Sequence, residues 1–232
     1  MSLKINGYRK ILKIATLALI VGVVGMFFVK VMIFEASYYD EKEGSEREEL
    51  VLVEEEEPLE EEEPTAEEVK EYVVAPDRPR YLSISKLGIS KARVISVGVK
   101  TNGEVGTPNN VFDVGWYEAS SKPGSGGTML IVGHNGGPNV FGVFKTLPNL
   151  SRGDLITVER GDGCIFEYEV VDNEAVSLAE ANNGYMGLAL RSPIEGEESI
   201  TLISCTGEWS QAKRTYLSRQ FTRAVLVGVK TS

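Results

Sequence analysis

The chain has only one histidine, His134, among its 232 residues. Zinc and iron sites built on imidazole ligands typically need two or three histidines, so the composition argues against a site of that kind. Inside the part of the chain that we expect to fold, no dense acidic cluster suggests a calcium site, and a need for calcium is left open. We therefore expect no cofactor, and any reaction that needs an imidazole must use His134.

Basic residues are also scarce, with 24 Lys and Arg against 34 Asp and Glu and a net charge of −10. The excess acid lies between Asp40 and Glu71, which hold 17 acids and three bases. Residues 1–39 carry five bases and one acid, so the rest of the chain holds 24 − 3 − 5 = 16 bases and 34 − 17 − 1 = 16 acids. A neutral folded part without a basic stripe argues against a nucleic-acid partner.

Residues 14–34 form one long apolar run, interrupted only by Thr16 and Lys30, and the run is long enough to cross a bilayer as a helix. Basic residues precede it and acidic ones follow it, which predicts a cytoplasmic N-terminus and an extracellular remainder. A cleaved signal peptide is the alternative, but the run is longer than a usual signal core and lacks a good small-residue cleavage site. We expect a single-pass anchor in the cell membrane.

The charge pattern divides the rest of the chain into a tether and one domain. Residues 35–77 are rich in glutamate, with prolines that interrupt helices, and such a segment is expected to be a solvated, disordered linker. The predicted organisation is a cytoplasmic N-terminus (1–13), a transmembrane anchor (14–34), the linker (35–77) and an extracellular domain (78–232). An acidic docking tail is the other reading of the linker.

The domain reads as short β-strands separated by Gly, Pro and Asn, which predicts an all-β barrel or sandwich. A hairpin is expected around the turn at 161–163, a short helix over 140–147, and a helical or irregular insert over 178–190. The expected strands are Tyr81–Ile84, Val94–Val99, Val111–Trp116, Thr128–Val132, Asp154–Glu159, Ile165–Val171, Ser199–Ser204 and Thr222–Val229.

A thiol and the single imidazole follow two of these strands directly. His134 follows the strand 128–132, and Cys205 follows the apolar strand 199–204. This is how a Cys–His nucleophilic pair is usually presented, with the imidazole as acid and base for the sulfur. Cys205 could instead be a small buried residue or form a disulfide with Cys164, and His134 could be a turn residue. Because Cys164 follows a turn and begins a strand, it looks structural.

Two stretches resemble sortases, the membrane-anchored cysteine transpeptidases of Gram-positive bacteria. Residues 201–205 read Thr-Leu-Ile-Ser-Cys, close to the family's Thr-Leu-x-Thr-Cys, with Ser204 keeping a hydroxyl in place of the threonine. The family's next strand is entered by an arginine, and Arg223 directly precedes the apolar residues 224–227. Arg219 and Arg214 are the alternatives. The sequence before His134, and residues 81–89 and 113–117, are also similar to the family, so that the resemblance covers about residues 80–230.

The resemblance implies a closed eight-stranded β-barrel with one or two short helices. It also implies that Cys205 is the nucleophile, His134 the general acid and base, and Arg223 the group that holds the substrate carbonyl or oxyanion. The implied substrates are proteins with a Leu-Pro-x-Thr-Gly-like sorting signal, cleaved after Thr through a thioacyl-enzyme and transferred to an amine of a cell-wall precursor or a pilin.

The subclass and two other functions are open at this point. A chain that stops just after the last strand, without a long insert between the sixth and seventh strands, is more similar to sortase classes D, E or F than to B or C. A thiol hydrolase that releases its peptide to water is one alternative function. A non-catalytic wall-binding β module is the other. Trp209, in the loop after Cys205, could line a substrate groove.

Overall fold

The computed structural model describes residues 58–231. The anchor predicted over residues 14–34 and most of the predicted linker lie outside these residues. Within residues 58–231, no helix has both the length and the apolar character needed to cross a membrane.

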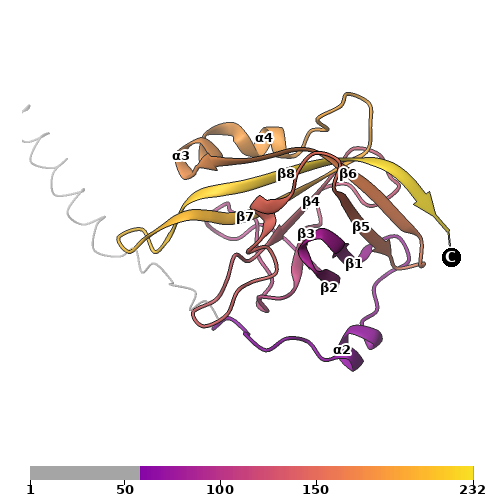
Figure 1. Ribbon diagram of the computed structural model, residues 1–232, viewed down its shortest axis with the longest axis horizontal. Coiled ribbons are helices and arrows are strands. Elements are labelled where there is room, and N and C mark those ends of the chain that lie inside the picture. The colour runs from indigo at the N-terminus through magenta and orange to yellow at the C-terminus, as the bar shows by residue number, and fades with distance from the viewer. Residues whose placement is uncertain (1–57, 232) are drawn as a thin grey trace, which may run out of the picture. The chain divides into compact units, whose positions relative to one another are not determined.

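Eight strands close into a barrel in the order β1-β2-β3-β4-β7-β8-β6-β5 (Figure 1). The predicted β-barrel is therefore confirmed. Two neighbouring pairs, β2 with β3 and β4 with β7, run parallel, and the other pairs are antiparallel. The strands are β1 Pro79–Ile84, β2 Ile89–Val97, β3 Val114–Tyr117, β4 Thr128–Gly133, β5 Leu155–Arg160, β6 Ile165–Ser177, β7 Ser199–Ser210 and β8 Thr215–Lys230.

The alternation of side chains along each strand divides the apolar residues into two clusters. One fills the barrel and includes Ile131 of β4 and Leu202 of β7. The other lies on the outer face of β4, β7 and β8, and includes Val132 and Ile203, the next residues along the same strands. All six residues of β4 are buried because both of its faces are covered, which explains its unbroken apolar sequence.

The outer cluster is covered by the connection between β6 and β7. This connection contains α3 Leu178–Glu180, the π-helical turn η3 Ala181–Tyr185 and α4 Met186–Ala189. α3 and α4 lie beside β8 (Figure 1), and α3 contacts this strand. The connection contributes Ala181 and Ala189 to the outer cluster, and the Tyr185 ring packs on Phe221 of β8 with 4.6 Å between centroids. The predicted insert over 178–190 is thus a covering element of the barrel's outer face.

Two expectations about local structure were wrong. The helix predicted over 140–147 is a series of turns, followed by the 3-10 turn η2 Leu147–Asn149. The loop folds back on itself instead, since the Gly142 amide donates to Asn135 O and the Phe144 amide to His134 O, both at 2.9 Å. The last strand begins at Thr215 rather than at residue 222, so β8 extends beyond the barrel with the end of β7 as a hairpin.

The described end of the predicted linker is attached to the barrel, so the boundary predicted at residue 77 is too late in the chain. Residues 66–71 form α2 (Ala66–Glu71), which begins at a capping box between Thr65 and Glu68. After the helix, the Tyr72 hydroxyl donates to Val94 O of β2 at 2.6 Å. This segment and α2 are purple in Figure 1 and run along one side of the barrel. η1 Ser85–Leu87 is the remaining short element, between β1 and β2.

Candidate active site

The pairing of β4 with β7 places His134 beside Cys205. Gly133 is the register partner of Ser204 in this parallel pair, and His134 and Cys205 are the residues that come next on the two chains. Neighbouring strands lie about 4.8 Å apart, so the two backbones are close enough for their side chains to meet. The two residues that the sequence singled out as a pair therefore occupy adjacent positions on neighbouring strands.

The pairing of β7 with β8 places Arg219, and not Arg223, opposite Cys205. Arg223 is the register partner of Thr201, four residues before the sulfur. Its guanidinium forms an ion pair with Asp172 of β6, and this carboxylate neutralises its charge. The choice of Arg223 rested on a strand that starts near residue 222. Because β8 starts at Thr215, both arginines lie within it, and the geometry favours Arg219.

The Cys205 and Arg219 side chains share the outer face of the barrel. Side chains two residues apart point to the same side of a strand, so Cys205 lies on the face of Ile203, and Arg219 on the face of Phe221. Both Ile203 and Phe221 belong to the outer cluster that the β6–β7 connection covers. Ser204 is buried on the opposite, inward face, so its hydroxyl does not face the same side as the sulfur.

His134 is held by one ring hydrogen bond and by its own backbone. Its Nε2 lies 2.8 Å from Pro108 O, and because a carbonyl only accepts, Nε2 must carry the proton. Nδ1 is then the ring nitrogen that can accept a proton in the neutral form. The preceding residue must be small, since a Cβ on Gly133 would lie 2.8 Å from Phe144 Cε2. The Phe144 amide also donates to His134 O, so the loop packs tightly around the backbone of His134.

Cys205 is partly buried and is not part of a disulfide. Both Cys205 and Cys164 are free thiols, which removes the Cys164–Cys205 bridge as an alternative. Burial raises the pKa of the Cys205 thiol above its ordinary value, while the nearby Arg219 guanidinium lowers the pKa and Glu104 raises it further. The sulfur is therefore protonated in the resting protein at neutral pH, and must lose its proton when it reacts.

Arg219 is held in place by the hairpin that β7 and β8 form. Its Nη1 donates to Tyr216 O at 2.9 Å and to Ser218 O at 3.1 Å, and its Nη2 donates to Thr215 Oγ1 at 3.1 Å. No carboxylate within residues 58–231 forms an ion pair with it, so its charge is not neutralised by a partner there. Further along the hairpin, Trp209 and Tyr216 meet edge to face with 5.2 Å between ring centroids. The Trp209 side chain is exposed.

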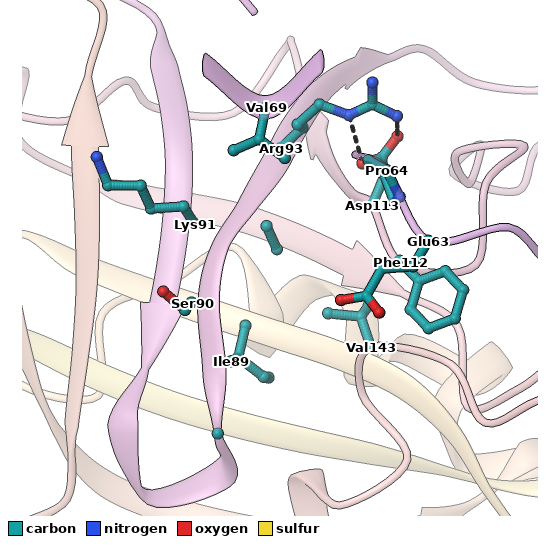
Figure 2. Close-up of a pocket in the computed structure, with 12 residues that line it drawn as sticks. Glu63, Pro64, Val69, Ile89, Ser90, Lys91, Arg93, Phe112, Asp113 and Val143 are labelled. Atoms are coloured by element: carbon teal, nitrogen blue, oxygen red, sulfur yellow. Dashed lines mark hydrogen bonds and ion pairs between the residues drawn. The ribbon is translucent and has the colours of Figure 1, made fainter. Parts of the chain in front are cut away.

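A pocket of about 170 Å³ lies elsewhere, between the segment before α2 and β2 (Figure 2). Its lining residues include Glu63, Phe112 and Val143, but none of the three residues discussed above. At its edge Arg93 and Asp113 form a two-pronged ion pair, with N–O distances of 2.9 and 2.8 Å, drawn as dashed lines in Figure 2. These groups satisfy one another, so the pair is a structural contact between β2 and the start of β3.

No group of three or more His, Cys, Asp and Glu side chains within residues 58–231 is arranged to hold a metal ion. The chemistry that the site can perform with its own residues is nucleophilic attack by a thiolate. An imidazole is available to exchange protons, and a fixed cation is available to stabilise an oxyanion.

Comparison with known proteins gives one family. A family model described as Sortase domain matches residues 82–227, well over half of the chain. Among solved structures, the SrtA sortase from Actinomyces oris is similar with 19% identity and a TM-score of 0.48, covering 68% of this chain and 84% of that one. A sortase D5 transpeptidase from Clostridium perfringens has 24% identity and a TM-score of 0.46, with 71% and 90% covered. No curated protein matches.

Proposed function

Because the chain belongs to the sortase family, we propose that it cleaves a Leu-Pro-x-Thr-Gly-like sorting signal and transfers the acyl part to an amine. The observation that carries this proposal is the shared level of three side chains on neighbouring strands. Cys205 is at the centre, His134 is on one side and Arg219 is on the other. Each has the chemistry that one part of an acyl transfer needs.

In the proposed reaction the Cys205 sulfur attacks the carbonyl carbon of the threonine in the signal. His134 takes the thiol proton, and it returns a proton to the departing glycine amine as the C–N bond breaks. This leaves a thioacyl-enzyme on Cys205. The incoming amine then attacks the thioester carbon, gives its proton to His134 and expels the sulfur as a thiolate. His134 returns that proton to the sulfur, which restores the thiol and the neutral imidazole of the resting enzyme.

Arg219 is the proposed oxyanion-stabilising residue in both steps. Its guanidinium is fixed by carbonyl and hydroxyl acceptors of the hairpin, so it needs little reorganisation when negative charge develops. A permanently charged planar donor suits a carbonyl oxygen that becomes an oxyanion. The role that the sequence suggested for Arg223 therefore passes to Arg219 in this proposal, and Arg223 connects β8 to β6 through Asp172.

We further propose that the domain acts outside the cell, held by the predicted span over residues 14–34. The acceptor would be an amine of a peptidoglycan precursor or of a pilin. The short helical segments between β6 and β7, in place of a long insert, support a relation to classes D, E or F rather than to class B. Transfer to an amine, rather than release to water, is what distinguishes this enzyme from a thiol hydrolase.

Intact-mass analysis of the full chain tests the proposal. The protein is incubated with Leu-Pro-x-Thr-Gly peptides that vary at the third residue, first alone and then with an oligoglycine amine. We expect a covalent adduct with the mass of the peptide up to threonine, and its conversion to an amine-linked product.

Two cysteine variants make the result specific. Cys164→Ser should still form the adduct, and Cys205→Ser should not. Peptide cleavage without an amine-linked product would favour the hydrolase. Absence of any adduct across the peptide set, with Cys205 unreactive toward an alkylating reagent, would favour the wall-binding module.

A further inference from the structure

The acidic segment before α2 is attached to the two loops that hold His134. We call residues 58–64 the strap. Glu60 pairs with the loop before β3 like a short parallel strand: its amide donates to Asn109 O at 3.1 Å, and the Val111 amide donates to Glu60 O at 3.0 Å. The buried Asn110 side chain adds a bond to Glu62 O at 2.9 Å. The strap is thus fixed to residues 109–111 by three hydrogen bonds.

Glu61 makes the second attachment, to the loop after His134. Its carboxylate accepts the backbone amide of Asn139 at 2.8 Å and the Asn139 side-chain amide at 2.6 Å. Gly137 leaves room for this contact, since a Cβ there would lie 3.0 Å from Glu61 Cδ. These hydrogen bonds hold the pKa of Glu61 below its ordinary value, with the backbone amide of Asn139 as the main cause. The carboxylate is therefore charged at neutral pH, when bonds of this type are strong.

One of these loops bonds the imidazole of His134, and the other continues from its backbone. Pro108, just before the residues paired with Glu60, provides the carbonyl that accepts His134 Nε2–H. On the other side, residues 135–142 fold into a closed loop, in which the Gly137 amide donates to Val140 O and the Gly142 amide to Asn135 O. Asn139 lies at the tip of that loop, so Glu61 holds the tip. Glu60 holds the residues that directly follow Pro108, whose carbonyl accepts the imidazole N–H.

We propose that Glu61 is a positioning residue for His134, and that the strap sets the geometry of the imidazole by bridging the loops on its two sides. The proposal depends on the role given to His134 under the proposed function. It also assigns a purpose to the last part of the acidic segment, which would otherwise serve only as a spacer.

The single histidine makes this proposal directly measurable. With ring-labelled histidine, the full chain gives one set of imidazole resonances, all from His134. We expect Glu61→Gln to move or broaden these resonances at neutral pH, because a glutamine can accept only one of the two Asn139 bonds without facing donor to donor. Gly137→Ala should do the same without a change of charge. Glu63→Gln, with the same loss of charge two residues along the strap, is the matched control and should leave the resonances in place.

Kinetics with the sorting peptide form the second arm. We expect Glu61→Gln and Gly137→Ala to lower kcat at least about tenfold, as small displacements of catalytic groups do, while KM changes by less than about twofold. A melting curve for each variant establishes that it is folded, and Asn139→Ala replaces any variant that is not. The proposal would be overturned by resonances that stay unmoved in both Glu61→Gln and Gly137→Ala, that move equally in Glu63→Gln, or that move without a loss of kcat. If the wild-type protein forms no adduct, the proposed function fails, whereas the resonance measurement still decides whether the strap positions His134.

Discussion

Arg219 lies directly opposite Cys205 across the β7–β8 pair. The two residues are joined by the register of an antiparallel ladder, in which directly opposite residues have Cα atoms about 4.5–5.5 Å apart. Arg223 lies four residues further along β8, opposite Thr201, and is bound to Asp172. We therefore expect the two arginines to differ in their effect on turnover, and the difference can be measured.

Replacing Arg219 should impair turnover far more than replacing Arg223. Arg219→Gln removes the fixed cation at the developing oxyanion, and losses of this kind lower kcat by about 10²–10³. Arg219→Lys should recover part of kcat, because it keeps the charge but loses the planar fork of donors. Steady-state kinetics with the sorting peptide give both values.

Arg223→Gln is the matched control for that series. It breaks a partly exposed ion pair, which should cost about 1 kcal/mol or less in the free energy of unfolding and leave kcat within a few fold. The assignment would be reversed if Arg223→Gln abolished turnover in a folded protein while Arg219→Gln did not.

The sequence predicted those features of the fold and site that depend on residues close together in the chain. The eight strands follow from local alternation and turn residues, and His134 and Cys205 were found because each one directly follows an apolar run. The position of Arg219 depends instead on which residue of β7 it faces. Residues 215–221, at the start of β8, lack a clear apolar pattern, so the strand looked shorter than it is.

The strap was missed for a related reason. Its contact between Glu61 and Asn139 spans 78 positions, and no local pattern marks such a contact. The glutamate-rich composition indicated a solvated linker over residues 35–77. One local signal was available, the Thr65–Glu68 capping box that starts α2, and it would have moved the start of the domain toward the N-terminus.

Alkylation should report the raised pKa of Cys205. In a Cys164→Ser background, the rate of reaction with iodoacetamide should keep rising from neutral to alkaline pH, because burial keeps the thiol protonated beyond its ordinary range. Since Arg219 lowers the pKa of Cys205, Arg219→Gln should shift the profile to still higher pH. Arg223→Gln should leave it unchanged. A rate that is already at its maximum at neutral pH would mean that a preformed thiolate is present.

The close contact behind His134 should make Gly133 sensitive to a single methyl group. A Cβ at this position runs into the Phe144 ring, which is fully buried in the barrel, and overpacking of this kind typically costs about 1–3 kcal/mol. Gly133→Ala should lower the free energy of unfolding by that amount, measured by urea denaturation.

The control is Gly187→Ala in α4, where a Cβ meets nothing within 4 Å. It should be neutral or slightly stabilising, since alanine favours a helix over glycine. Equal losses in the two variants would show that Phe144 can move aside.

Acidification below pH 4.5 should weaken the contact between Glu61 and Asn139. The pKa of its carboxyl is lowered by the Asn139 donors, so its contribution to stability is complete above the ordinary value of 4.5 and is lost as the pH falls through the lowered value. With selectively labelled asparagine, the Asn139 amide resonance of the full chain should titrate with a midpoint below 4.5. That step should be absent in Glu61→Gln and present in Glu63→Gln, because Glu61 accepts both of the Asn139 hydrogen bonds. The imidazole resonances of His134 should shift over the same pH range in the wild-type chain and lack that shift in Glu61→Gln, since the loop tip is then no longer held by a titrating group. An Asn139 step that persists in Glu61→Gln would assign the titration to another carboxylate and separate it from the strap.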